Sequence, residues 1–133
     1  MITMTVCTGS CLCGSVQFRF HSPCLWSAHC HCLMCQRAHG AAFVTWVGVE
    51  QTSFEVTQEQ QLRWYHSSGD AQRGFCRQCG STLFFQSERW PGEMHIVRSN
   101  ISGDIEMPPS AHVYWESHAS WFEFDDPLPR RSS

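Results

Sequence analysis

The sequence contains no lysine, so its positive charge comes from nine arginines alone. Twelve acidic residues outnumber them, which gives a formal net charge of −3 with the histidines neutral. Proteins that bind nucleic acids usually carry a basic face or stripe. The charge balance therefore argues against a nucleic-acid partner, since the one run of basic residues is the pair Arg130-Arg131.

Long apolar runs are also missing. No stretch approaches the roughly 18 apolar residues that a membrane-spanning helix needs. Residues Met1 to Ser10 have neither the basic region nor the apolar run of a secretory signal peptide. We therefore expect a cytoplasmic protein without a membrane partner. Its 133 residues have the length of one domain, which we expect to span residues 1–133.

Nine cysteines are the most unusual feature that is present. An odd number without a secretory signal argues against a disulfide framework, and seven of the nine fall into three short clusters with the spacing of metal ligands. In a reducing compartment such thiols stay free to bind a metal ion. Cys7 and Cys24 lie outside the clusters, and we expect them to be small buried apolar residues.

The middle cluster places three thiols within six residues, as Cys30, Cys32 and Cys35. Zn²⁺ binds thiolates at about 2.3 Å and closes such a short loop around itself. Three protein ligands leave one position open for water or a substrate thiol, which is typical of catalytic zinc. The alternative is a second structural site with a fourth ligand that the sequence does not identify. His31 is the nearest candidate, but its place between two cysteines favours a pocket residue.

The outer two clusters supply four more thiols, Cys11, Cys13, Cys76 and Cys79, and each pair is followed by glycine. Four thiolates make a closed, structural zinc site. One Zn²⁺ would then tie the start of the chain to a late hairpin, and its binding energy would add to the folding free energy. The alternative is a redox-active C-x-x-C pair. It is disfavoured because no βαβ pattern surrounds the second pair.

Other polar and aromatic residues near the clusters are weaker candidates. His29 and His39 are further possible ligands, and Arg37, Arg73 and Arg77 could each hold an anionic substrate or lie solvated at the surface. Three tryptophans could line a pocket, although aromatic residues at strand spacing are more often part of the core: Trp46, Trp64 and Trp90.

The apolar pattern predicts a mainly β domain with little helix. Residues 16–20 alternate apolar and polar positions, as a half-buried strand does. The one helix is expected over residues 33–39 and ends at Gly40. Further strands are expected over residues 3–7, 25–29, 43–49, 53–57, 61–66, 81–86, 94–97 and 111–115, with loops at 67–70 and 98–109 and an irregular tail from Trp121.

Together these motifs resemble the glutathione-dependent formaldehyde-activating enzyme family, which also includes the centromere protein V type of domain. The resemblance covers nearly the whole chain. It begins at Gly9–Val16, continues through Cys30–Ala41 and Phe75–Ser81, and ends with His112–Trp115 and Trp121–Pro129. The order and spacing of all three cysteine clusters make it specific.

The resemblance implies a β-tent of several small antiparallel sheets around two zinc ions per chain. It implies that the structural zinc is held by Cys11, Cys13, Cys76 and Cys79, and the catalytic zinc by Cys30, Cys32 and Cys35. The family's named reaction joins glutathione and formaldehyde to S-(hydroxymethyl)glutathione, formally as a carbon–sulfur lyase. The partners would be a small thiol and an aldehyde. His31 becomes a candidate catalytic residue, and Arg37 a candidate to bind glutathione.

Three functional hypotheses remain open at this point. The protein is an enzyme acting on glutathione and formaldehyde, an enzyme with the same chemistry on another thiol or aldehyde, or a zinc-stabilised binding module without catalysis. A large basic surface would favour the binding module, and the negative net charge favours an enzyme. This chain has Gln36-Arg37 where many members of the family carry a second basic residue after the middle cluster.

Overall fold

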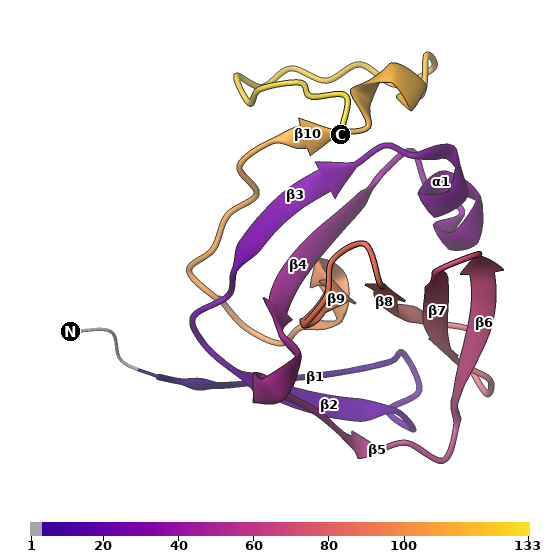
Figure 1. The fold of residues 1–133 in the computed structure, drawn as a ribbon, viewed down its shortest axis with the longest axis vertical. Helices are drawn as coiled ribbons and strands as arrows, with labels where there is room; N and C mark the ends of the chain where they lie inside the picture. Colours follow the sequence, from indigo (N-terminus) through magenta and orange to yellow (C-terminus); the bar gives the residue numbers. More distant parts are fainter. Residues whose placement is uncertain (1–3) are drawn as a thin grey trace.

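A computed structural model describes residues 4–133 as two β-sheets with little helix (Figure 1). The expected mainly β fold is thus confirmed. The strands are β1 (Val6–Ser10), β2 (Gln17–His21), β3 (Trp26–Cys30), β4 (Val44–Glu50), β5 (Phe54–Gln58), β6 (Leu62–Ser68), β7 (Ala71–Cys76), β8 (Thr82–Ser87), β9 (Glu93–Val97) and β10 (His112–Val113). The helical segments are α1 (Leu33–His39) and the 3-10 turns η1 (Gln51–Ser53), η2 (Arg98–Asn100) and η3 (Trp115–Ser117).

The two sheets differ in size. The smaller has the strand order β1-β2-β5, and the larger has the order β10-β3-β4-β9-β8-β7-β6. Neighbouring strands are antiparallel except for β10, which lies parallel to β3. In Figure 1 the small sheet crosses one end of the molecule, and β3 and β4 lead from it toward α1.

The side-chain pattern of each strand follows its place in the sheets. β2 alternates between exposed and buried residues, so that Phe18 and Phe20 face inward, as the sequence predicts. β4 lies between β3 and β9 and is buried along most of its length. Side chains of both sheets meet in the larger of two core clusters, which includes Phe18 of β2 as well as Phe84 and Ile96 of the larger sheet.

Most predicted elements lie within a residue or two of their observed bounds. The helix spans residues 33–39 and ends at Gly40 as predicted. The strand predicted over 3–7 overlaps β1 only at residues 6 and 7, because β1 begins at Val6 and continues to Ser10, and residue 3 lies outside the described part of the chain. The loop predicted at 67–70 is shorter, since β6 continues to Ser68, and β7 was not predicted. No helix within residues 4–133 is long and apolar enough to cross a membrane.

Candidate metal centres and active-site pocket

The four-cysteine cluster (Cys11, Cys13, Cys76 and Cys79) joins the β1–β2 turn to the β7–β8 turn. Its sulfur atoms all lie within 4.8 Å of one another. Cys13 Sγ is 3.7 Å from Cys11 Sγ and 3.8 Å from Cys76 Sγ. Tetrahedral zinc with bonds of about 2.3 Å separates its sulfur ligands by about 3.8 Å. The four thiols therefore fit a closed zinc site.

Backbone turns support this cluster from outside. Gly14 and Gly80 follow the two cysteine pairs with φ angles of 81° and 80°, which residues with a side chain rarely adopt. After the first turn, the Val16 N–H donates to Cys11 Sγ at 3.2 Å. Hydrogen bonds to sulfur favour its ionised, metal-binding form.

The three-cysteine cluster (Cys30, Cys32 and Cys35) lies at the corner where β3 leads into α1. Its sulfur atoms also lie within 4.8 Å of one another, with 3.5 Å between Cys30 and Cys35. Within residues 4–133, no histidine, acidic residue or further cysteine completes this group to four. The three thiols fit a zinc ion that keeps one coordination position free.

The start of α1 favours an ionised thiol in this cluster. Cys32 caps the helix, and its Sγ accepts a hydrogen bond from the Cys35 N–H at 3.2 Å. Hydrogen bonds from the Cys30 and Cys35 thiols lower the pKa of Cys32. Hydrogen bonds to Cys32 and Cys35, together with burial, raise the pKa of Cys30. Arg73 Nη2 lies 3.6 Å from Cys35 Sγ and offsets negative charge on the sulfurs.

A cavity of about 470 Å³ opens beside the three-cysteine cluster. Small-molecule sites usually measure about 300–1,000 Å³ and are mostly apolar. The three cysteines form part of the wall, and the main apolar and aromatic side chains around them are Trp26, Leu33, Met34, Trp46, Phe85 and Trp90. The cavity thus gives a small molecule access to the three-cysteine cluster.

The Trp26 side of the cavity is held rigidly. Its indole packs on Gly48, where an added Cβ would overlap the ring. Trp26 Nε1 donates to Glu93 Oε1 at 2.9 Å, and the same oxygen lies 2.9 Å from His95 Nε2. Burial lowers the pKa of His95, although Glu93 acts in the opposite direction. Burial thus favours the neutral form of this imidazole, which the contact with Glu93 orients.

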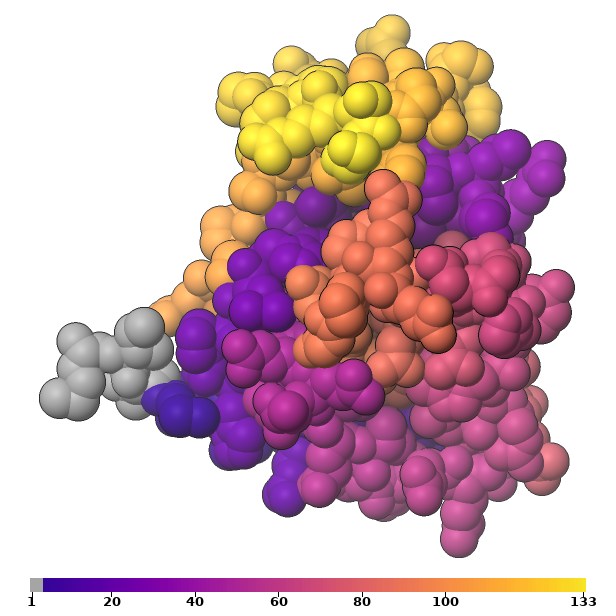
Figure 2. Space-filling model, in the orientation of Figure 1, coloured from indigo at the N-terminus to yellow at the C-terminus, as the bar shows by residue number. Residues whose placement is uncertain are grey.

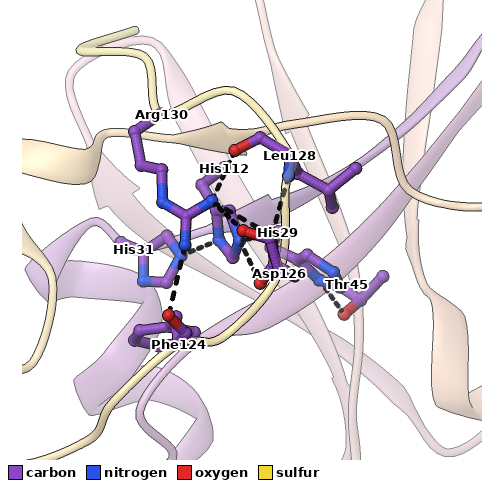
Figure 3. Close-up of polar contacts among 8 residues, drawn as sticks. All are labelled: His29, His31, Thr45, His112, Phe124, Asp126, Leu128 and Arg130. Atoms are coloured by element: carbon purple, nitrogen blue, oxygen red, sulfur yellow. Dashed lines mark hydrogen bonds and ion pairs between the residues drawn. The ribbon is translucent and has the colours of Figure 1, made fainter.

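His31 does not line the cavity, and its ring instead lies with the C-terminal tail (Figure 3). It is fully buried, and its Nε2 is 2.7 Å from His112 Nδ1. His112 Nε2 lies 3.0 Å from both carboxylate oxygens of Asp126, and Arg130 Nη1 pairs with Asp126 Oδ1 at 3.1 Å. Burial, with His112 next in effect, lowers the pKa of His31 to about 4. The His31 ring is therefore neutral and is buried in the contact between His112 and the C-terminal tail, which we call the tail contact.

The other candidate histidines bind threonines. His29 Nδ1 lies 2.8 Å from Thr45 Oγ1, and His39 Nδ1 lies 2.7 Å from Thr82 Oγ1. Among residues 4–133, neither belongs to a group of possible metal ligands. Of the two cysteines outside the clusters, Cys24 is buried and Cys7 is partly buried, in agreement with their expected apolar role.

The arginines near the clusters take different places. Arg73 lines the cavity, whereas Arg37 is exposed on α1 outside it. Arg77 is also outside, and its Nε donates to Gln61 Oε1 at 2.8 Å. The cavity has a second arginine, Arg89, which the sequence did not single out. Binding of a substrate by Arg37 stays a prediction that the cavity does not support.

Two of the three candidate tryptophans line the cavity, namely Trp46 and Trp90. Trp64 instead stacks on Phe84, with ring centroids 6.1 Å apart. Aromatic residues at strand positions thus serve both as cavity wall and as core packing.

The sequence profile of the family described as glutathione-dependent formaldehyde-activating enzyme matches residues 6–117. The chain belongs to this family. The curated protein "Putative glutathione-dependent formaldehyde-activating enzyme" of Halomonas elongata is 30% identical over an alignment of 125 residues, and the alignment covers 88% of this chain and 80% of that protein. An uncharacterized lyase of Schizosaccharomyces pombe is 32% identical over 79 residues, 58% of this chain and 55% of its own.

A crystal structure of a Rhodobacter sphaeroides protein has the same fold, with a TM-score of 0.62 and 24% identity over 73% of this chain and 89% of that one. The present chain is the member of the formaldehyde-activating family described above. All seven of its clustered cysteines lie inside residues 6–117, the range that the family profile matches. Asp126 and Arg130 lie outside that range. The family match therefore does not include the tail residues that contact His112, and the structure is what reveals this contact.

The polar residues of the cavity wall that the sequence did not single out include Arg89, His95 and Tyr114. They come from the β8–β9 connection, from β9 and from the segment after β10. None has a local spacing relation to a cysteine cluster. Only the pairing of β9 with β4 and of β10 with β3 brings their segments to the cavity.

We expect the protein to contain two zinc ions per chain when it is produced with zinc and kept reduced. The three-cysteine cluster offers one ligand fewer and borders an open cavity, so a mild chelator should remove its zinc first. Elemental analysis before and after chelation measures both expectations. A reduced, folded protein with one zinc or none before chelation would contradict the division into four and three ligands.

Proposed function

We propose that this protein is a zinc-dependent carbon–sulfur lyase that joins glutathione and formaldehyde to S-(hydroxymethyl)glutathione. The observation that carries the proposal is the three-cysteine cluster in the wall of a cavity, without a fourth ligand among residues 4–133. Membership of the glutathione-dependent formaldehyde-activating enzyme family supports it, as does the word lyase in the name of the yeast relative.

The two clusters have the soft sulfur donors that suit zinc. We assign the structural zinc to the four-cysteine cluster and the catalytic zinc to the three-cysteine cluster. Zinc in the second site would supply a positive centre that lowers the pKa of a coordinating thiol. An unperturbed thiol has a pKa of about 8.5 and is mostly protonated at neutral pH.

The residues of the chain bind and orient the two reactants. Leu33 and Met34 add apolar surface to the cavity next to the cysteines. The Arg73 guanidinium, 3.6 Å from Cys35 Sγ, stabilises negative charge near the reacting sulfur. Holding the thiol and the aldehyde in one cavity reduces the entropic part of the barrier.

The reaction forms one carbon–sulfur bond and needs no oxidant or reductant. The thiol sulfur attacks the carbonyl carbon, the thiol proton is released, and the carbonyl oxygen takes up a proton to become the hydroxyl group. His31, the candidate catalytic residue, does not line the cavity. We therefore assign that proton to water at the cavity mouth.

The proposal is tested by exchange NMR spectroscopy of formaldehyde with glutathione in the presence of the zinc-loaded protein. Cys35→Ser should abolish the acceleration over the spontaneous reaction, because it removes one of three ligands beside the cavity. Cys7→Ser is the matched control, since it also removes one thiol but lies outside both clusters. It should leave the exchange rate unchanged.

Equal exchange rates for the wild type and Cys35→Ser would contradict the proposal for this pair of substrates. The same assay should then be repeated with other thiols and aldehydes. Acceleration of one of those reactions would identify an enzyme with a different substrate, and no acceleration in the series would favour the binding module.

A further inference from the structure

Two arginines of the cavity have no acidic partner. Within the described residues, the arginine salt bridges are formed by Arg19 with Glu55 and by Arg130 with Asp126. Neither Arg73 nor Arg89 takes part in one, although both line the cavity. The one acidic residue of the cavity lining, Asp70, is exposed and forms no ion pair with either of them. The positive charges of the cavity are thus available to a bound molecule.

Arg89 is exposed at the cavity but held in position. Its Nη1 donates to Tyr114 Oη at 3.0 Å, and its guanidinium carbon lies 4.9 Å from the centre of the Trp90 ring. The β8–β9 connection that carries Arg89 projects toward the C-terminal segment in Figure 2. A guanidinium held by a hydroxyl and an aromatic face keeps further N–H groups for an anion.

The backbone of Tyr114 has an unusual conformation for an aromatic residue, with a φ angle of 55°. Residues with a side chain pay energy to adopt this left-handed region, and such strain tends to occur at functional sites. Tyr114 directly follows β10, and its left-handed backbone occurs at the residue whose hydroxyl contacts Arg89. The strain therefore coincides with the contact that orients Arg89.

Arg73 provides a second positive charge, beside the sulfur atoms. Its Nη2 contacts Cys35 Sγ, whereas its Nε and Nη1 are buried without a hydrogen-bond partner among the described residues. Its guanidinium carbon lies 5.0 Å from the centre of the Phe85 ring. Buried polar groups without partners are rare in folded proteins and need an explanation. A negatively charged ligand in the cavity would add a second electrostatic partner to the sulfur atoms that Arg73 already faces.

We propose that this cavity selects thiols that carry carboxylate groups, with Arg89 as the residue that determines this specificity and Arg73 as the second positive charge. The inference rests on the proposed function and names its class of thiol. The planar guanidinium matches a carboxylate through two parallel hydrogen bonds, so anionic thiols are preferred over neutral ones of the same size.

The test uses S-methylglutathione, whose thioether cannot react, and its dimethyl ester, in which both carboxylates are masked. Binding to the zinc-loaded protein is followed by tryptophan fluorescence, because Trp26, Trp46 and Trp90 line the cavity. The wild type should bind the acid about 10-fold or more tightly than the ester, the usual effect of losing a hydrogen bond to a charged group.

Variants assign the preference to a residue. Arg89→Gln should weaken binding of the acid about 10-fold and bring the acid-to-ester ratio close to one. Tyr114→Phe should lower the ratio less, because it removes only the hydroxyl that orients Arg89. Arg63→Gln is the control, because it removes one positive charge as Arg89→Gln does, but Arg63 is exposed and does not line the cavity. Its ratio should equal that of the wild type.

Several results would overturn the proposal. For the wild type, they are equal binding of acid and ester or no detectable binding of the acid. For the variants, they are an unchanged acid-to-ester ratio in Arg89→Gln, or a loss of the preference for the acid in Arg37→Gln instead. The exchange assay with formaldehyde is independent of these measurements. A protein that binds the acid selectively but does not accelerate exchange would refute the proposed reaction and leave the selectivity established.

Discussion

Replacement of Cys76 by serine is expected to unfold the protein or cause it to aggregate. Cys76 is fully buried at the end of β7, and its cluster joins two turns that are far apart in the sequence. Structural zinc contributes about 10 kcal/mol or more of folding free energy in small zinc domains. That contribution matches the whole net stability of a typical domain, about 5–15 kcal/mol. Circular dichroism should therefore show no cooperative thermal transition for Cys76→Ser.

Cys35→Ser is the matched comparison, because it also removes one buried sulfur ligand. Its cluster lies within six residues of sequence and does not connect distant segments. This variant should keep a cooperative transition and one zinc per chain by elemental analysis. If the two variants melt alike and lose the same amount of metal, the structural and catalytic assignments are wrong.

His112→Phe is expected to destabilise the protein and loosen the three-cysteine cluster. Phenylalanine keeps a ring in this fully buried position but removes both ring nitrogens, one paired with His31 Nε2 and the other with the Asp126 carboxylate. A buried donor left without a partner costs about 1–3 kcal/mol. β10 pairs with β3 next to Cys30, so the loss reaches the start of the cluster. Urea denaturation should show the decrease in the free energy of unfolding.

The control for this variant is His118→Phe. His118 is exposed, and its ring stacks on Trp115, which phenylalanine can also do. The control should stay within about 0.5 kcal/mol of the wild type, as surface substitutions usually do. Equal stability of His112→Phe and wild type would show that the contact between His31, His112 and Asp126 does not hold the tail.

The features predicted well from the sequence are those with a local cause. The helix α1 has its predicted bounds because Cys32 caps its start and Gly40, with a φ angle of 61°, ends it. β7 was missed because Gln72-Arg73-Gly74 has no residue of high β-propensity. It forms because β6 and β8 pair with it on both sides. The predicted strand at 111–115 is reduced to β10, because Tyr114 has a left-handed backbone.

The same distinction applies to the candidate site. Both cysteine clusters could be recognised from spacing alone. Within each cluster, the structure brings the sulfur atoms to within 4.8 Å of one another. The side chains facing those sulfurs depend on long-range strand pairing, so Arg89 had no signal and Arg37 was favoured for its closeness in sequence. His31 shows the opposite case. Its place between two cysteines favoured a pocket residue, and the family resemblance made it a candidate catalytic residue, whereas its ring is buried with His112.

The wide sequence separation within the four-cysteine cluster has a consequence for synthesis of the protein in the cell. Cys13 and Cys76 are 63 residues apart. At about 5–20 residues per second, the ribosome needs roughly 3–13 seconds to deliver the second pair after the first. The three-cysteine group emerges as one block, so the nascent chain can take up a metal ion there earlier. Zinc shortage during translation would thus leave Cys11 and Cys13 as unprotected thiols, open to oxidation, in the newly made chain.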